Sequence, residues 1–388
     1  MILARQNRQD LQFAETLEKL LKEKGFSSVK MATGEPAEIR KKIGDSLRNG
    51  ETVDIMVTTR SYAPAAVRIK ENFPELSSVK LLTPSSYTWP TFLLPENLMN
   101  VANQIVVIAI IAVGMTMVIV SSGIDLSVGS LIALSAVIVT WLIRRAGGPT
   151  ASPGTMILCA LAAIVLCGSL GAFTGFMITR FKLPPFIATL GMMQVASGFA
   201  YIISQGKPIY EVPDSFVWLG RGIAPILSVP YAVIMMILIY LAAHILMTRT
   251  TLGRHIYAVG GNAEAARLSG VRVNAVLLFV YITCGVMAGL GGIVMASQLK
   301  SGAPTYGQMY ELYVIASVVV GGASLSGGEG RIMGTLIGAF IIAVIQNGMN
   351  LTNVESYTQK VVLGFVILGA VLLDMLKKRG WRRRKKTP

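Results

Sequence analysis

The 388-residue sequence has little charge, little histidine and little cysteine, and each shortage excludes a class of protein. Charged residues make up 14% of the chain and apolar residues 53%, whereas about a quarter of a soluble domain is charged. The two histidines, His244 and His255, form no metal-ligand or catalytic-triad pattern. The three cysteines lie in apolar runs without metal-ligand spacing, so we expect buried, small hydrophobic side chains there: Cys159, Cys167 and Cys284. The sequence therefore predicts neither a catalytic site nor a metal site.

A phosphate-binding loop is also missing. The stretch GGASLSGGEGR at 321–331 contains LSGGE, which is similar to the signature of ABC-type ATPases. That signature works beside a GxxxxGK[ST] loop, and the Gly-Lys pair at 206–207 is followed by Pro208 instead. We interpret 321–331 as a glycine-rich cytoplasmic turn that lets two spans approach closely. No cofactor is expected on this chain.

The net charge of +15 is unevenly distributed. Eight basic residues crowd 377–386, directly after an apolar run. This pattern is typical of a cytoplasmic stop after a last membrane span, held near anionic headgroups. We therefore expect membrane lipids, and no nucleic acid, as partners of a basic cytoplasmic tail at 379–388.

The remaining charge divides the chain into two parts. Residues 1–95 hold fourteen Lys and Arg and eleven Asp and Glu, whereas residues 101–250 hold ten charged residues in all. Three regions follow: a leader over 1–90, a transmembrane domain over 91–378 and the basic tail. The stretch YTWPTFLLP at 87–95 has the Trp, Tyr and Pro content of a membrane interface.

In the leader, amphipathic helical patterns alternate with short apolar runs. Helices are predicted over 13–25, 36–50 and 63–73, and strands over 28–33, 53–59 and 77–83. Such alternation indicates a small α/β unit with a parallel sheet. The pattern resembles a fragment of a sugar-type periplasmic binding protein, although about 70 residues bury only a marginal core.

Nine apolar segments follow the leader, at about 101–120, 127–143, 155–179, 185–204, 227–248, 273–297, 311–322, 334–350 and 358–377. Several are shorter than the roughly 20 residues of a straight span, and many contain glycine. Short, interrupted segments favour broken or re-entrant helices that line a polar cavity. The expected fold is an all-α polytopic membrane protein preceded by a small α/β region.

With the basic tail inside, the positive-inside rule predicts a topology. Residues 248–272 and 180–182 fall inside and 204–221 outside, whereas the arginine pair at 144–145 falls outside against the rule. Nine spans also place the leader outside, yet residues 1–20 contain no export segment. Either one segment is re-entrant, or the natural chain begins upstream of Met1.

The polar stretch 248–272 separates two membrane-length apolar runs. It contains a short predicted helix with its own start and stop signals. Asn262 is a candidate N-cap, Glu264 lies in the first turn, and Gly270 supplies a left-handed stop. Two interpretations remain open: an ordinary loop helix, or a handle that a partner binds at the membrane surface.

Polar residues inside the apolar runs are the candidates for a solute path. Amides and hydroxyls match hydroxylated ligands, and hydrogen bonds between helices explain any one of them equally well. Asp125 is either a substrate ligand or a cap of the next segment. The candidate residues are Asn103, Gln104, Thr116, Asp125, Gln194, Gln346 and Asn347, with Ser197 and Asn350 beside them.

Several long stretches in one order carry a family resemblance: FLLPENLMNVANQ, AVGMTMVIVSSGIDLSVGSLIALS, FKLPPFIATLGMM, TLGRHIYAVGGNAEAARLSGV and GGASLSGGEGRIMGTLIGA. From about Phe92 to Lys378 the chain resembles a ribose/xylose-type ABC sugar permease, the membrane subunit of a bacterial importer. The resemblance implies import of a monosaccharide across the plasma membrane, a second permease copy, an ATPase subunit that holds the ATP, and a periplasmic sugar-binding protein. It also implies an ATPase-coupling segment that contains Gly261, Asn262, Glu264, Ala265, Arg267 and Gly270.

The chain departs from the family at its start. The first transmembrane helix that normally precedes the FLLPENL stretch is absent, and the α/β leader stands in its place. A fusion that begins upstream and a remodelled, inactive product are both consistent with this. The rival function classes are an ion-coupled or passive carrier and a non-transporting sugar sensor, and the sequence does not identify the sugar.

Overall fold

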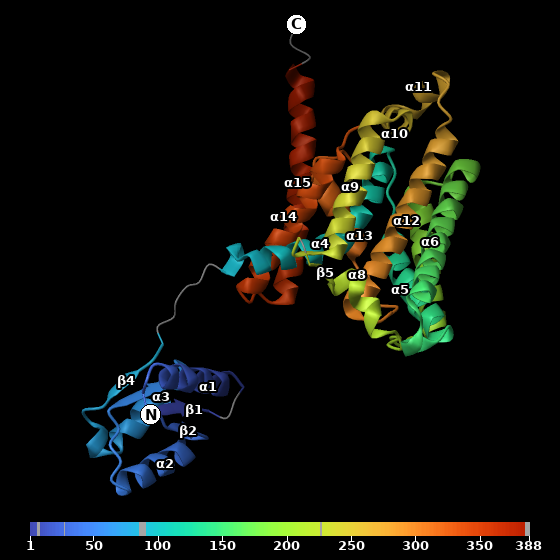
Figure 1. Ribbon diagram of the computed structural model, residues 1–388. Coiled ribbons are helices and arrows are strands. Elements are labelled where there is room, and N and C mark those ends of the chain that lie inside the picture. Colours follow the sequence, from blue (N-terminus) through green and yellow to red (C-terminus); the bar gives the residue numbers. More distant parts are fainter. Residues whose placement is uncertain (6–7, 27, 85–90, 226, 385–388) are drawn as a thin grey trace. The chain divides into compact units, whose positions relative to one another are not determined.

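A computed structural model describes residues 1–5, 8–26, 28–84, 91–225 and 227–384 (Figure 1). The chain divides into two compact units, Met1–Trp89 and Pro90–Pro388. The first is an α/β unit and the second a helical bundle, so each is described by itself.

The first unit is built on a four-stranded parallel sheet with the order β2-β1-β3-β4. The parallel sheet and the predicted sequence of helices and strands are confirmed, but the sequence analysis missed β1, which has only three residues and therefore no readable period. The elements are β1 Ile2–Ala4, α1 Arg8–Glu23, β2 Met31–Thr33, α2 Pro36–Arg48, β3 Ile55–Thr58, α3 Ala63–Glu71, a 3-10 turn at Pro74–Leu76 and β4 Lys80–Leu82.

Helices cover both faces of this sheet. Successive side chains of β1 point to opposite faces, so its apolar residues need a helix on each side. Ile2 and Ala4 pack with Ala14 of α1 on one face. Leu3 packs with Ile39 of α2 on the other. The missed strand is thus the centre of the unit's core.

The second unit contains helices at all nine predicted apolar segments. Seven are long and apolar enough to cross a membrane, and two apolar helices, Tyr310–Val320 and Ser356–Leu372, are shorter. The prediction of a polytopic helical membrane protein is confirmed. The nine helices are α4 Pro95–Val120, α5 Val128–Arg145, α6 Pro153–Phe181, α7 Pro185–Ser204, α9 Tyr231–Arg249, α12 Val273–Leu299, α13 Tyr310–Val320, α14 Ile332–Leu351 and α15 Ser356–Arg384.

Short elements connect these helices. They are 3-10 turns at Thr91–Leu93, Gly148–Thr150 and Asp214–Val217, helix α8 Trp218–Arg221, a two-stranded ribbon of β5 Ile223–Ala224 and β6 Val229–Pro230, and the helices α10 Thr251–Gly261 and α11 Ala263–Leu268.

The core of the bundle is the contact between α4 and α12. Helix α4 is the most buried of the seven long helices. Glycine lets the two backbones approach, since a Cβ at Gly114 would lie 2.7 Å from the Cα of Cys284. All three cysteines are free and buried, as predicted.

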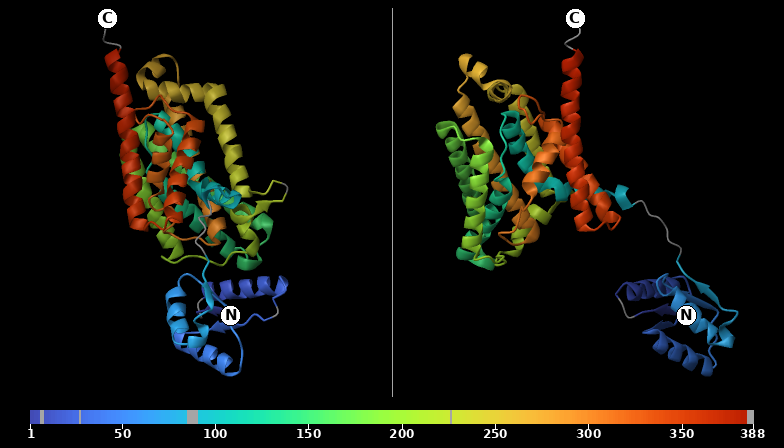
Figure 2. Two further views of the ribbon diagram at one scale, coloured as in Figure 1. Left: turned by 90° about the vertical axis from the view of Figure 1, so that its left-hand side faces the viewer. Right: turned by 180° about the vertical axis from the view of Figure 1, so that it is seen from behind.

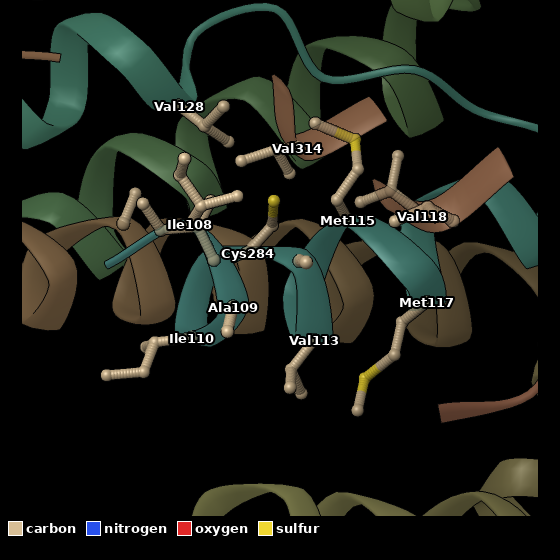
Figure 3. Close-up of a cluster of buried hydrophobic side chains, with 14 of the residues drawn as sticks. Ile108, Ala109, Ile110, Val113, Met115, Met117, Val118, Val128, Cys284 and Val314 are labelled. Atoms are coloured by element: carbon tan, nitrogen blue, oxygen red, sulfur yellow. The ribbon is translucent and has the colours of Figure 1, made fainter. Parts of the chain in front are cut away.

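Two helices, the 18-residue α5 and the 11-residue α13, begin inside the bundle. Val128 at the start of α5 and Val314 near the start of α13 lie together with Ile108 and Cys284 (Figure 3). Ile108 and Cys284 are near the middle of α4 and α12. We call α5 and α13 half-helices, because both begin near the middle of α4 and α12, after irregular segments at 121–127 and 300–309. That any segment is re-entrant stays a prediction.

The two ends of the bundle carry different connecting elements. Helices α10 and α11 lie at the same end as the C-terminal end of α15, and the turn Gly148–Thr150 lies at the opposite end (Figures 1 and 2). The predicted topology requires this sidedness. Which end faces the cytoplasm stays a prediction.

Candidate coupling and transport sites

The polar stretch 248–272 folds into two capped helices. Asn262 caps α11, because its Oδ1 accepts hydrogen bonds from the N–H groups of Glu264 at 3.0 Å and Ala265 at 2.9 Å. Gly270 ends this part with φ +85°. Both features were predicted, but the longer α10 was missed. Apolar residues at helical spacing, Leu252, Ile256 and Val259, were the signal for it.

Helix α11 projects from the bundle. Leu268 is 84% exposed, and Ala266 is the one buried side chain among its six residues. Glu264 and Arg267 form an ion pair at 3.5 Å with side chains 69% and 56% exposed, so the pair contributes little to stability. The helix therefore presents an apolar residue and two charges to whatever lies outside the bundle.

Helix α10 is fixed to the bundle where it meets the end of α4. The Ser122 hydroxyl donates to the carbonyl of Gly260 at 2.9 Å and lies 3.1 Å from the carbonyl of Ser326. A Cβ at Gly260 would clash with the backbone carbonyl of Val120. Backbone therefore touches backbone here, which requires glycine.

The glycine-rich turn 321–331 completes this contact. Gly328 N–H donates to the carbonyl of Val120 at 2.8 Å, and the Tyr257 hydroxyl donates to the carbonyl of Gly330 at 2.7 Å. The predicted close-packed turn between two helices is confirmed. We call the contact among α10, the end of α4 and this turn the junction.

A cavity of about 570 Å³ adjoins the junction. Its wall includes the cations Lys182 and Arg267 and the buried Tyr281. Among the described residues, the Tyr281 hydroxyl is one of three buried side-chain polar groups without a hydrogen-bond partner. Five segments line the cavity: 121–123, 178–185, 259–267, 273–281 and Ser326.

Two of the predicted path residues join α4 to α14. The Thr116 hydroxyl is fully buried and lies 2.8 Å from the hydroxyl of Thr335. Asn347 exchanges two 3.0 Å hydrogen bonds with Asn97. Both therefore make the interhelical hydrogen bonds that were the alternative to substrate binding.

Asp125 has the geometry of a local cap. It is 1% exposed, and its Oδ1 accepts hydrogen bonds from the N–H of Ser127 at 2.9 Å and from the Ser127 hydroxyl at 2.6 Å. These bonds fix the turn from which α5 starts.

The other path candidates lie apart from these. Asn103 is half-buried, and its amide donates to the carbonyl of Gly220 at 3.4 Å. Gln104 and Gln194 are exposed, and Gln346 is half-buried. In the part of the chain that the structure describes, no hydrogen bond joins any two of the seven candidates. Whether they contact a solute stays a prediction.

One membrane-depth carboxylate was missed. Glu311 lies in the first turn of α13, half-buried, and its carboxylate is close to the backbone of Gly129 at the start of α5. Glu311 could have been predicted in the same way as Asp125, because it is an acidic residue inside an apolar run.

A bundle of apolar helices, with two broken helices inside and a capped helical projection at one end, is typical of the membrane subunit of a transport system. Residues 97–371 match the family described as "Branched-chain amino acid transport system / permease component". The chain belongs to this family, and the relatives below confirm the predicted resemblance to ribose-type permeases.

The chain is similar to named permeases over most of their length. It is 44% identical to the ribose import permease protein RbsC of Escherichia coli strain K12 over 293 residues, which cover 74% of this chain and 88% of the relative. The ribose import permease protein RbsC of Bacillus subtilis strain 168 is 42% identical over 290 residues, 74% of this chain and 87% of the relative. The D-allose transport system permease protein AlsC of E. coli K12 is 37% identical over 285 residues, 74% and 85%. No solved structure gives a significant match.

Proposed function

We propose that this chain is the membrane subunit of an ATP-driven importer that carries a monosaccharide across the bacterial inner membrane. The relatives support the substrate class, since they are named for import of ribose, D-allose, L-arabinose and fructose. The observation that carries the ATP-driven mechanism is the exposed α11, fixed through α10 to the end of α4.

In this mechanism an ATPase subunit binds α11 from the cytoplasm. The ATP stays on that partner. Movement of α11 passes through α10 and the junction to α4 and to the turn that connects α13 with α14. The bundle then shifts between inward-facing and outward-facing states, which requires different contacts in the two states. A second copy of the chain completes the path, a periplasmic sugar-binding protein delivers the sugar, and the C-terminal tail lies in the cytoplasm.

The coupling residues remain those predicted from the sequence: Gly261, Asn262, Glu264, Ala265, Arg267 and Gly270. The geometry supports distinct parts for them. Asn262 caps α11, Gly270 ends it, and the exposed charges of Glu264 and Arg267 are available to a partner. The path residues Asn103, Gln104, Thr116, Asp125, Gln194, Gln346 and Asn347 stay candidates.

The family description offers branched-chain amino acids as a second substrate class. Sugars are favoured because the named relatives, at 33–44% identity, are named for ribose, D-allose, L-arabinose and fructose. An uptake screen that includes D-ribose, L-arabinose, D-fructose and L-leucine decides between the classes.

The test is reconstitution of the chain with an ATPase subunit and a sugar-binding protein from the same system. We expect sugar-stimulated ATP hydrolysis and uptake. The double variant Glu264→Ala, Arg267→Ala should insert normally and lose ATP-driven uptake. The matched control Glu355→Ala, Lys360→Ala removes two exposed charges near the start of α15 and should transport normally.

Three results contradict the proposal. Uptake that needs no ATP indicates a carrier, and binding without flux indicates a sensor. Normal uptake by the double variant shows that Glu264 and Arg267 of α11 do not couple transport to the ATPase subunit. A Cys at position 265 gives a direct check, since the three native cysteines are buried. It should cross-link to the ATPase subunit in membranes.

A further inference from the structure

The segment that leads into α13 concentrates polar and aromatic side chains at membrane depth. Residues 301–313 read SGAPTYGQMYELY. Three tyrosines, one amide and one carboxylate occur within eight residues: Tyr306, Gln308, Tyr310, Glu311 and Tyr313. The rest of α13, from Val314 to Val320, is apolar apart from Ser317. This composition marks the start of the half-helix as different from the core around it.

The carboxylate of Glu311 occupies space that Gly129 leaves open. A Cβ at Gly129 would clash with Oε2 of Glu311 and would lie 2.6 Å from the carbonyl oxygen of Gly307. Gly307 has φ +70°, a conformation that favours glycine. The start of α5 therefore leaves room for this side chain at Gly129, and Gly307 packs against the same turn of α5.

A carboxylate at this depth is costly against lipid. None of the ion pairs among the described residues includes Glu311. The side chain is half-buried, and Gln308, Met309 and Leu312 beside it are exposed. Non-helical backbone such as 300–309 is also restricted to places that are covered by protein or that line water. The carboxylate and the irregular backbone therefore indicate water or protein, and not lipid, beside Glu311 and Gln308.

The chemistry of the surface suits a hydroxylated ring. A carboxylate accepts charge-assisted hydrogen bonds from hydroxyl groups, and an amide both donates and accepts. Tyrosine adds an apolar ring with a polar end. Tyr310 and Tyr313 pack edge to face, with ring centroids 6.2 Å apart and planes at 86°, which holds both rings at this site.

We propose that the start of α13 is a sugar-recognition site, in which Glu311 accepts hydrogen bonds from two sugar hydroxyls and Gln308 and Tyr310 contact the ring. The proposal deepens the import function and rests on it for the substrate class. It gives the bundle a place that selects its solute at the level where both half-helices begin.

The first test measures access and does not depend on ATP. Gln308→Cys introduces an exposed thiol into a chain whose own cysteines are buried. A membrane-permeant thiol reagent should label it in the purified full chain, and D-ribose, D-allose, L-arabinose or D-fructose should slow the labelling, whereas L-leucine should not. Adding Glu311→Gln should remove this protection.

The second test measures transport. Glu311→Gln should lower the maximal rate of sugar uptake about tenfold or more, since hydrogen bonds to charged groups are the stronger ones. Membrane insertion and basal ATP hydrolysis should stay normal. Glu355→Gln, which changes an exposed carboxylate before α15, should transport like the wild type.

The outcomes separate this inference from the import function. Sugar protection of Gln308→Cys without ATP-driven uptake supports the site and contradicts the importer. Sugar uptake by wild type with unprotected or unlabelled Gln308→Cys contradicts the site, as does normal uptake by Glu311→Gln. Protection by L-leucine alone would reassign the site to amino acids and overturn the proposal.

Discussion

The two half-helices begin at the same depth but use their carboxylates differently. Before α5, Asp125 is 1% exposed, and its oxygen accepts two hydrogen bonds from Ser127. In the first turn of α13, Glu311 is half-buried and reaches the space beside Gly129. An acidic residue in an apolar run therefore has two meanings. Asp125 is enclosed by its partners Ser127 and Cys284 and builds the fold, whereas Glu311 accepts a bond from its own N–H and is half-buried, so part of its carboxylate is available to a ligand.

The two half-helices pack on long helices that run in opposite directions. Helix α12 packs on α5 and α6, as α4 packs on α13 and α14. Helix α4 ends at the junction, whereas α12 begins beside α11 and runs away from it. Accordingly α5 runs from mid-depth to the far end, and α13 runs from mid-depth to the junction. Asp125 and Glu311 thus lie near the starts of two helices that run in opposite directions.

The largest expected effect is on stability at the first position. Asp125→Ala leaves the buried N–H and hydroxyl of Ser127 without an acceptor, so we expect a loss of roughly 2–5 kcal/mol. Asp125→Asn retains an acceptor and should lose much less. Thermal unfolding of the purified protein, followed by tryptophan fluorescence, measures both. If Asp125→Ala unfolds at the same temperature as the wild type, Asp125 does not stabilise the turn before α5.

The next effect tests the close contact between Gly129 of α5 and Glu311 of α13. Gly129→Ala pushes a methyl group against Glu311 and the carbonyl of Gly307, and should cost about 1–3 kcal/mol as well as displacing the carboxylate. Gly191→Ala in α7 meets nothing within 4 Å and should be neutral or stabilising by up to about 1 kcal/mol. Equal melting temperatures for the two variants would show that the glycine is not required for space.

A smaller effect on stability is expected at the second position. Glu311→Ala removes only the acceptor of its own N–H in the first turn of α13, so its stability should fall by roughly 0.5–1.5 kcal/mol, less than in Asp125→Ala, while sugar uptake falls. Paired melting and uptake assays check this. A destabilisation as large as that of Asp125→Ala would make the two carboxylates equivalent.

The smallest effect concerns Asp214, in the turn Asp214–Val217. Its carboxylate pairs with Lys300, the residue that follows α12. The bond from Lys300 holds the pKa of Asp214 below its usual range. Because the folded-state pKa is lowered, the stabilisation is present above the ordinary aspartate pKa of about 4 and is lost as the pH falls through the folded-state value.

The melting temperature of wild type should therefore exceed that of Asp214→Asn slightly at pH 7, and the two should converge near pH 3. Asp214 is almost fully exposed, which is why we expect a small difference. A difference that persists at low pH would show that the charge is not its origin.

Much of the fold could be predicted because it depends on local chemistry. The nine apolar segments, the Asn262 cap and the Gly270 stop all follow from residues within a few positions of each other. Missed features depended on contacts between distant segments. Nothing in the sequence near Thr116 indicates that Thr335 faces it, and nothing near Glu311 shows that Gly129 makes room for it. Polar residues were therefore found in the right helices without their partners.

The contact between Gly260 and Val120 has a mechanical consequence. Side chains between two elements can absorb a displacement by changing rotamer, so a linkage made of them is compliant. At the junction no side chain separates the two backbones, and the bond from Ser122 holds them in place. A shift of α10 toward α4 is therefore passed directly from one backbone to the other, because no side chain lies between them to absorb it.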